Sequence, residues 1–599
     1  MEEDDESVLD IKRRELLKAI GAGTLAAAFG GNPLGNAATA ATQSSAPEHR
    51  KGEGGAYNIL LILTDQERYF RPFELPGDYH LPAHERLAKK GVVFENHRIN
   101  SCVCTSSRSV LYTGRHIQQT RMFDNVNFPW ISSMSTEIKT LGHLLREAGY
   151  YTAYKGKWHL SREFETTNTL AAPEKIFTKE MEAYGFSDYF GVGDIIAHTQ
   201  GGYLHDGMIA AAAASWLRGQ AAVLTEQGKP WFLAVNVVNP HDVMFYDTDE
   251  PGHPVQGKNV LAHIAPDPAH ALYAQQWTFD LPASFQQRPD APGRPLAHTD
   301  FDRSNSVMVG PVGDETSRWR KRHNYYLNCL RDVDRHIETV LDELEATGLA
   351  SSTIVILTSD HGDLDGAHRL SGKGATSYRE QNNVPLIVAH PAYPGGKRCK
   401  AVTSHLDIAP TLISFTNASS EKKAAIAKEL PGKDFSSILA EPEKAGPEAV
   451  RDGQLFCFNM FATLDGEFLE KARDLLKQGN AAKIKESGLR PDMMKRGAIR
   501  SVFDGRYQFT RYFSPKQHNR PVTIEELFKL NDVELFDLQN DPYELKNLAL
   551  DLTNNADLLI TMNAKLNKLI DSEVGEDVGQ MLPGGLEAGW VATPVVNDL

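Results

Sequence analysis

Cysteine is scarce in this chain, which has only five cysteines among its 599 residues. They are Cys102, Cys104, Cys329, Cys399 and Cys457. So few cysteines exclude a disulfide framework, and the odd number leaves at least one thiol unpaired. A disulfide between Cys102 and Cys104 would be strained because only one residue separates them, and no second pair of cysteines or histidines follows at the spacing of a zinc finger. Two interpretations of Cys102 and Cys104 stay open: either can be a reactive nucleophile or a buried thiol.

The chain also lacks an excess of basic residues. Its 63 lysines and arginines are outnumbered by 78 aspartates and glutamates, which gives a formal net charge of -15. Proteins that bind duplex nucleic acid concentrate basic charge, so we expect no nucleic-acid partner. The length and an apolar content of 41% allow a large buried core, in one big domain or two unequal ones. These features are typical of a soluble, acidic enzyme.

The apolar run near the N-terminus is too short and too rich in glycine for a stable membrane anchor, and it predicts an export signal instead. Arg13 and Arg14 precede the run AIGAGTLAAAFGG, and the small residues 38–40 form a cleavage site of the expected type. We therefore predict a twin-arginine signal peptide over 1–40, a linker at 41–56, and export by the twin-arginine machinery to the periplasm or the cell exterior. Proteins that use this route cross the membrane folded, so cofactors and modifications can be installed first. An N-terminal helix with a basic start is the alternative.

Strand patterns alternate with helix patterns through most of the chain. Residues 58–65 (NILLILTD) form an apolar run that predicts a strand, 82–91 (PAHERLAKKG) predict a helix, and 92–99 (VVFENHRI) predict the next strand. Further on, 135–150 predict an amphipathic helix closed by glycine, and 318–348 predict a long helix. Strands that alternate with helices imply an α/β fold, in which a mostly parallel sheet is covered by helices on both faces.

Polar residues follow four of the predicted strands, at the point where each strand ends. They are Asp65 and Gln66, Asp360 and His361, His241 and Asp242, and Lys157 and His159. In α/β sheets the ligand site lies beyond the carboxyl ends of the strands. Two acidic positions from separate strands, each followed by another oxygen or nitrogen donor, suit one divalent cation. The alternatives are that these aspartates cap helices or form turns, and that the histidines are structural.

The pattern changes after Asn417, where a charged, alanine-rich stretch begins. Residues 498–513 (AIRSVFDGRYQFTRYF) predict an antiparallel hairpin with Asp504 and Gly505 at its turn. Residues 556–574 then predict a helix. We therefore expect the last third of the chain to be organised differently from the part before it.

Six motifs follow one another in the order found in one enzyme family. In the first, Cys104-Thr105-Ser106-Ser107-Arg108 leads into Thr113-Gly114-Arg115, where the family has Cys-x-Pro-Ser-Arg-x-x-x-x-Thr-Gly. The other five are GYYT at 149–152 with GKWH at 156–159, NPHD at 239–242, SDHGD at 359–363, SHLDIAPTL at 404–412 and ELFDLQNDPYELKNLA at 534–549. On these residues the chain resembles the formylglycine-dependent sulfatases of the alkaline phosphatase superfamily, from about Asn58 to Ala549.

The resemblance implies a fold with two parts. The catalytic domain, at 57–417, would have an alkaline phosphatase-like architecture, a large, mostly parallel mixed sheet sandwiched by helices. A smaller C-terminal subdomain, an antiparallel sheet with one helix, would lie within 418–599 together with the C-terminal tail.

The resemblance also implies an unusual nucleophile. In this family a dedicated maturation enzyme oxidises the motif cysteine, here Cys104, to formylglycine, whose aldehyde hydrates to a geminal diol. One hydroxyl attacks sulfur, and the other loses a proton and expels sulfate as the aldehyde re-forms. Ser106 departs from the family pattern, because it stands where proline usually presets the extended conformation that the maturation enzyme reads. Cys102 has the wrong spacing to Arg108 and Gly114 for this role.

The same motif matches imply a metal site and a set of catalytic side chains. The implied metal ligands are Asp65, Gln66, Cys104 as formylglycine, Asp360 and His361, around one divalent cation that acts as a Lewis acid. Calcium is the usual ion of the family, and the nitrogen donor of His361 gives manganese some weight. The implied catalytic residues are Arg108, which fixes the diol, Lys157, a sulfate partner, His159, the base for the eliminating hydroxyl, and His241 and Lys373, which hold sulfate and protonate the leaving oxygen.

These implications favour an exported sulfuric ester hydrolase that acts on a small-molecule or saccharide sulfate ester. Gln66 and His361 resemble the corresponding residues of phosphonate monoester hydrolases, so hydrolysis of phosphonate monoesters or phosphodiesters is one alternative. An unconverted, non-catalytic anion-binding homologue is another. A purely structural role would leave the converging polar residues unexplained.

Overall fold

The computed structural model describes residues 55–128, 130–165, 173–191, 199–258, 262–477 and 487–580. The signal peptide predicted at 1–40 lies outside the described residues. All described residues belong to one unit of the chain, Pro47–Leu599. Within that part of the chain, no helix is long and apolar enough to cross a membrane.

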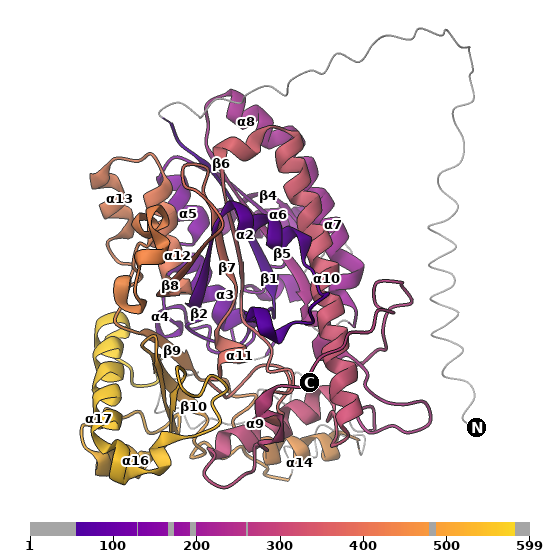
Figure 1. Ribbon diagram of the computed structural model, residues 1–599, viewed down its shortest axis with the longest axis vertical. Coiled ribbons are helices and arrows are strands. Elements are labelled where there is room, and N and C mark those ends of the chain that lie inside the picture. The colour runs from indigo at the N-terminus through magenta and orange to yellow at the C-terminus, as the bar shows by residue number, and fades with distance from the viewer. Residues whose placement is uncertain are drawn as a thin grey trace. The chain divides into compact units, whose positions relative to one another are not determined.

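An eight-stranded sheet forms the centre of this unit (Figure 1). Its strands are β1 (Asn58–Asp65), β2 (Val92–Arg98), β3 (Tyr151–Gly156), β4 (Ser187–Phe190), β5 (Trp231–Pro240), β6 (Thr353–Ser359), β7 (Leu386–Ala389) and β8 (Lys397–Ser404). They lie in the order β4-β3-β5-β1-β6-β7-β2-β8. Every neighbouring pair is parallel except the two pairs that involve β7. The predicted mostly parallel, mixed sheet is thus confirmed.

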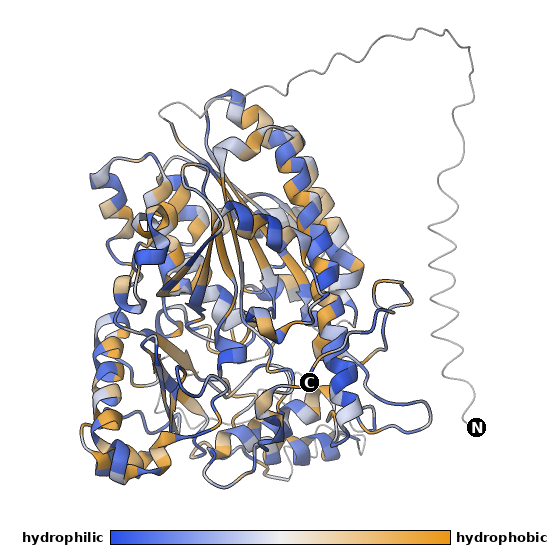
Figure 2. Ribbon diagram, in the orientation of Figure 1, coloured by the Kyte–Doolittle hydropathy of each residue, from blue (hydrophilic) through white to orange (hydrophobic). Residues whose placement is uncertain are grey.

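Helices cover both faces of this sheet. Successive side chains of a strand point to opposite faces, so each central strand places apolar side chains on both. On one face, Leu60 and Ile62 of β1 pack with α2 (Pro82–Lys90), α7 (Gly201–Trp216) and α10 (Thr316–Ala346). On the other face, Ile59 and Leu61 pack with α3 (Cys104–Thr113), α5 (Leu141–Glu147) and α12 (His405–Phe415). Strands that are buried on both faces have continuous apolar sequences, and Figure 2 shows them as orange strands at the centre.

The helix predicted at 135–150 is shorter than expected. It begins at Leu141 and ends at Glu147, because Thr140 adopts an extended conformation and its hydroxyl caps the helix by accepting a hydrogen bond from the Gly142 amide at 3.1 Å. The five residues before Thr140 therefore stay outside the helix. The long helix predicted at 318–348 is confirmed as α10.

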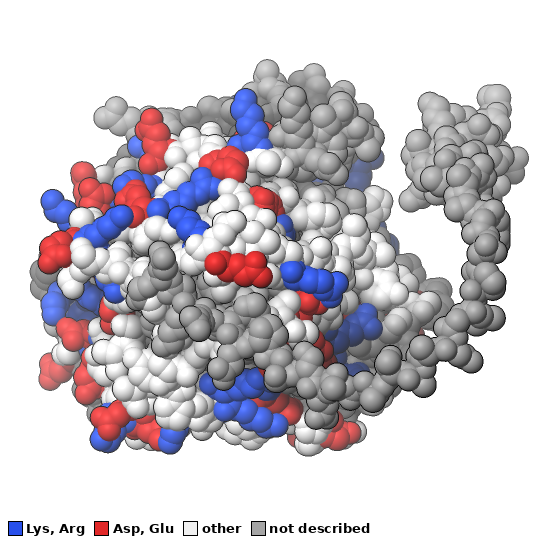
Figure 3. Space-filling view, turned by 90° about the horizontal axis from the view of Figure 1, so that it is seen from above, with Lys and Arg blue, Asp and Glu red and all other residues white. Residues whose placement is uncertain are grey.

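A second sheet, with four antiparallel strands in the order β12-β11-β10-β9, follows in the last third of the chain. Its strands are β9 (Gln454–Phe458), β10 (Ala498–Phe503), β11 (Tyr507–Phe513) and β12 (Asn531–Asp537). The predicted hairpin is β10–β11, and Gly505 at its turn has a φ of 99°, which favours glycine. The predicted helix is α17 (Leu552–Leu569), whose Leu559 and Leu566 share one apolar cluster with Val502 and Leu535 of this sheet. On the face of the unit drawn in Figure 3, acidic and basic side chains are interspersed.

Candidate active site

Four adjacent parallel strands, β3, β5, β1 and β6, deliver the predicted polar residues to one edge of the large sheet. Asp65 is the last residue of β1, and Asp360 follows β6 directly. Lys157 follows β3 and His241 follows β5. Because the carboxyl ends of neighbouring parallel strands meet at the same edge, residues far apart in the sequence become neighbours in space.

Four of the predicted metal ligands form one buried cluster. Asp65, Cys104, Asp360 and His361 each place a ligand atom within 4.8 Å of the others. His361 Nε2 lies 3.1 Å from Cys104 Sγ and 3.7 Å from Asp360 Oδ1. His361 Nδ1 lies 3.0 Å from the carbonyl oxygen of Gly362, so this nitrogen donates and Nε2 keeps a lone pair that faces the cluster. Burial lowers the pKa of His361 and keeps the ring neutral, so the donor set fits a divalent cation.

The side chain of the fifth predicted ligand, Gln66, contacts two residues outside the cluster. Its side-chain oxygen accepts a hydrogen bond from Lys373, and its side-chain amide donates to Asp363. Its backbone amide donates to Asp360 Oδ1 at 3.1 Å, which places Gln66 beside the cluster. The structure thus brings two predicted site residues, Gln66 and Lys373, into direct contact, and the proposed ligand role of Gln66 stays a prediction.

Arg108 is completely buried and bridges the two carboxylates of the cluster. Its Nε donates to Asp360 Oδ2 at 2.9 Å and its Nη2 donates to Asp65 Oδ2 at 3.1 Å. Burial disfavours the charged form, but Asp360 and Asp65 outweigh it and raise the pKa of Arg108 above its ordinary value. Arg108 therefore stays positive and orients both acids.

The two carboxylates differ in protonation because their surroundings differ. Burial alone would raise the pKa of Asp65, but the positive charges of Lys157, at 2.6 Å, and of Arg108 hold this pKa well below its usual range. For Asp360, burial and then the negative charge of Asp65 raise the pKa to about 6. A bound dication would favour the charged form of both groups, so the pair is suited to coordination.

His159 and His241 lie at the same edge of the sheet, and both are buried. For each of them, burial first and then nearby cations lower the pKa well below 6.5. A neutral imidazole can accept a proton, which fits the base predicted at His159. Nε2 of His241 has no hydrogen-bond partner among the described residues. The individual catalytic roles of these histidines stay predictions.

The two cysteines of the first motif have different surroundings. Cys104 is the first residue of α3, faces the cluster and is 1% exposed. Cys102 belongs to an apolar cluster with Val103 and Phe301, where burial raises its pKa well above 9. A thiol with a raised pKa is unreactive, so Cys102 is a buried thiol.

Three further residues support the site, and the sequence interpretation did not assign them. Asn236 of β5 accepts hydrogen bonds from Arg108 at 3.3 Å and from Tyr112 at 2.7 Å. His405 lies 3.2 Å from the hydroxyl of Ser107, and Asp363 contacts Gln66. For Asn236 the available signal was a polar residue inside the apolar run 231–238, and the motifs SHLDIAPTL and SDHGD contained the other two residues.

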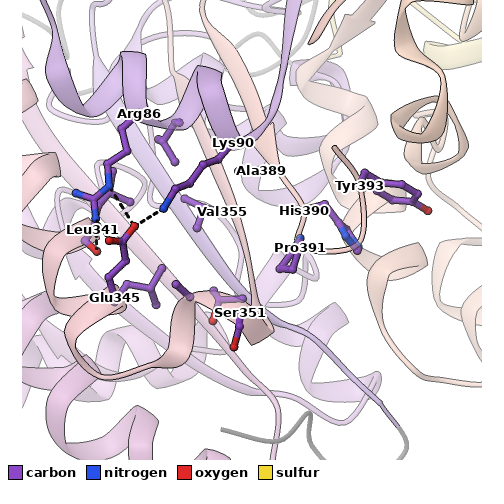
Figure 4. A pocket seen from close by; sticks show the side chains of 14 residues that line it. Arg86, Lys90, Leu341, Glu345, Ser351, Val355, Ala389, His390, Pro391 and Tyr393 are labelled. Carbon is purple, nitrogen blue, oxygen red and sulfur yellow. Dashed lines mark hydrogen bonds and ion pairs between the residues drawn. The ribbon is translucent and has the colours of Figure 1, made fainter. Parts of the chain in front are cut away.

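A pocket of about 360 Å³ lies at the opposite edge of the sheet, close to where β6 begins and β7 ends (Figure 4). Arg86 and Lys90 both pair with Glu345 there. Apolar side chains such as Val355 line the rest. None of the predicted site residues lines this pocket, so it is separate from the candidate active site.

Comparisons with known proteins agree with the motifs. A family model described as Sulfatase matches residues 57–418. The uncharacterized sulfatase YidJ of Escherichia coli is 29% identical over 413 residues, which are 65% of this chain and 72% of YidJ. An endo-4-O-sulfatase of Bacteroides thetaiotaomicron is 24% identical over 588 residues, 93% of this chain and 98% of that protein. A delta 4,5-hexuronate-2-O-sulfatase of the same organism is 24% identical over 82% of this chain and 85% of its own length.

Solved structures share the fold. A structure described as a putative sulfatase from Bacteroides thetaiotaomicron has a TM-score of 0.59 and 19% identity, and covers 91% of this chain and 100% of that chain. The phosphonate monoester hydrolase of Agrobacterium radiobacter has a TM-score of 0.57 and 18% identity, and covers 86% of this chain and 96% of that chain. Both the α/β architecture and the relation to phosphonate monoester hydrolases that the sequence predicts are thus confirmed at the level of fold.

Proposed function

The chain belongs to the sulfatase family, whose members cleave sulfate esters, and from this premise we propose that it releases sulfate through a formylglycine formed from Cys104. One observation carries the proposal: Cys104 opens α3 within 4.8 Å of the ligand atoms of Asp65, Asp360 and His361. A nucleophile made from this residue would stand beside a metal ion, with Arg108 fixing both carboxylates.

The side chains of Asp65, Asp360 and His361 would hold the divalent cation, together with the oxygen atoms of the converted residue 104 and with Gln66. The lone pair of His361 Nε2 and the two adjacent buried carboxylates support this assignment. When bound, the cation supplies a Lewis acid for a sulfate oxygen and lowers the pKa of the diol. Calcium is the proposed ion, and the imidazole donor makes manganese the alternative.

The reaction then divides into a displacement at sulfur and an elimination of sulfate. One hydroxyl of the hydrated residue 104 would give its proton to an adjacent carboxylate of the cluster and form a bond to sulfur. The bond from sulfur to the ester oxygen breaks, and this oxygen leaves as an alcohol after taking a proton from Lys373 or His241. The second hydroxyl next gives its proton to His159, its carbon–oxygen bond becomes a carbonyl, and sulfate departs with the electrons of the other carbon–oxygen bond. Water adds to the aldehyde and restores the diol. Lys157, which contacts Asp65 at 2.6 Å, would balance the charge of sulfate.

A sulfated saccharide is the substrate class that we propose. The relatives that extend over most of the chain include the endo-4-O-sulfatase and the hexuronate-2-O-sulfatase. We further propose that the chain is exported by the twin-arginine route, because Arg13 and Arg14 precede a short apolar run of small residues.

Mass spectrometry of the tryptic peptide Ile99–Arg108, from protein made in its native host, tests the nucleophile. We expect a mass loss that matches the change of the Cys104 side chain from CH2SH to CHO. Sulfate release from sulfated saccharides and phosphonate ester hydrolysis should be compared in the same preparation. An unmodified thiol together with unchanged turnover in Cys104→Ala would refute the mechanism, and faster turnover of the phosphonate ester would establish the alternative activity.

A further inference from the structure

Three buried side chains converge at a second place, outside the candidate active site. They are His368, in the short helical turn η8 (Ala367–Arg369), Glu380, in α11 (Arg379–Asn382), and Glu544, in the loop after β12. Each offers a ligand atom within 4.8 Å of the others. Their exposed fractions are 0%, 3% and 1%, so water does not solvate them freely.

Each of the three side chains has one polar atom that no other described residue satisfies. These atoms are His368 Nε2, Glu380 Oε2 and Glu544 Oε1. The remaining atoms of the same groups are engaged: Glu380 Oε1 accepts from Arg379 Nη2 at 3.0 Å, and Glu544 Oε2 accepts from the Arg379 amide at 2.9 Å. A buried polar atom without a partner costs free energy, and three of them at one place indicate a common missing partner.

The orientation of His368 suits a metal ligand. Its Nδ1 lies 3.0 Å from Gln287 Oε1, which can accept the Nδ1 proton and so leave a lone pair on Nε2. The ring is held by stacking on Tyr378, with 3.7 Å between ring centroids. Arg294 Nη2, which lies 3.0 Å from the same Nδ1, donates to Gln287 and so anchors the acceptor.

The guanidinium groups of Arg379 and Arg98, which lie near the two carboxylates, are shared with other partners. The guanidinium of Arg379 also pairs with Glu74 at 2.6 Å. That of Arg98 donates to Gln508 at 3.1 Å and lies 3.6 Å from the centroid of the Phe503 ring.

We propose that His368, Glu380 and Glu544 bind a divalent transition-metal ion of the zinc class. One imidazole and two carboxylates are a donor set that zinc accepts, with water in the fourth position. Zinc forms bonds of about 2.0–2.2 Å to nitrogen and oxygen, so ligand atoms within 4.8 Å of one another need only small shifts to reach it. Calcium takes about six to eight oxygen ligands, more than these two carboxylates supply.

A hollow of about 590 Å³ supplies an entry path for the ion. Its lining includes Glu380 itself and Tyr543, the neighbour of Glu544 in the chain. The ion would therefore reach the three ligands from the surface of the folded protein.

Such an ion would join the C-terminal part of the chain to the loop that serves the active site. Glu544 follows the second sheet, whereas His368 precedes Lys373 by five residues in the same loop. In α11, the carbonyl oxygen of Gln381 accepts a hydrogen bond from the amide of Gly362, next to His361. The ion is thus a structural one that positions this loop, and it does not depend on the proposed catalytic function.

Metal analysis of the full-length chain, produced in medium supplemented with zinc, tests the site. We expect one zinc ion per chain in the wild type and in Asp360→Asn, and none in His368→Gln or Glu544→Gln. His298→Gln is the matched control, because His298 is also buried and its ring centroid lies 5.3 Å from that of Tyr378. This variant should keep its zinc.

A second measurement covers the case in which the variants do not fold. Wild-type protein stripped with a chelator should bind one equivalent of zinc and gain several degrees in melting temperature, with or without activity. The proposal fails if the folded wild type holds no zinc and gains no stability from it, which would indicate that Glu380 and Glu544 share a proton. It also fails if His368→Gln keeps the zinc ion.

Discussion

Replacement of Arg108 by methionine should destabilise the protein strongly, because this side chain compensates two buried carboxylates at once. Arg108, Asp65 and Asp360 are all 0% exposed, and the two ion pairs measure 3.1 and 2.9 Å. Removing one partner of a buried ion pair costs about 3–5 kcal/mol, since it leaves an uncompensated charge. With an unfolding entropy of about 2.1 cal/mol/K per residue, a chain of 599 residues should lose about 2–4 °C in melting temperature.

Calorimetry in the presence of a chelator measures this effect. The control is Arg115→Met, because Arg115 pairs with Glu429 at 2.7 Å on the surface, where Glu429 is 76% exposed and solvent weakens such a pair. Added calcium should restore part of the loss in Arg108→Met, because the ion places positive charge between the same carboxylates. If Arg108→Met shifts the melting temperature no more than Arg115→Met, Arg108 does not hold the acids as described.

Three further predictions concern the nucleophile, the metal and pH. Cys104→Ala should abolish sulfate release, whereas Cys102→Ala, in an apolar cluster, should keep most of it, and equal losses would contradict the different environments of the two thiols. Calcium added to chelator-treated protein should stabilise the wild type by about 2.7 kcal/mol at a hundred times the dissociation constant, while Asp360→Asn should show no rise in melting temperature. Burial disfavours the charge of His84, but Glu67 at 3.0 Å and Asp334 at 2.6 Å outweigh it and raise the pKa to about 10. Stabilisation by His84 is therefore complete below pH 6.5 and is lost as the pH rises towards 10, so the difference in melting temperature between wild type and His84→Gln should shrink over that range, and a difference independent of pH would exclude this effect.

The large sheet could be predicted because its strands are buried on both faces. The apolar run of β1 and its terminal Asp65 can be read directly from the sequence. A continuous apolar run of this length is typical of a strand that is covered on both faces. The antiparallel direction of β7 could not be predicted in this way. Its residues are as apolar as those of a parallel strand, and its direction depends on how α11 and the preceding loop enter the sheet.

The candidate site was predictable to the extent that it depends on strand ends. Asp65 and Asp360 meet because β1 and β6 are neighbours. The contact between Lys373 and Gln66 was not predictable, since it joins a loop to a strand end 307 positions away. The same holds for His368 and Glu544, which no motif spacing relates and which only the packing of the C-terminal segment brings together.

The complete burial of α3 has a consequence for the order of events in the life of the chain. All ten residues of this helix are buried, Cys104 and Ser106 included. On the proposed route a maturation enzyme must reach Cys104 in an extended segment, so conversion has to precede folding. The twin-arginine route carries folded proteins, so conversion also has to occur in the compartment of synthesis. In each newly made molecule, conversion of Cys104 would thus compete with folding. A molecule that folds first would keep its thiol for as long as it stays folded. Slower folding, or more maturation enzyme, would then raise the fraction of active molecules without altering the folded structure.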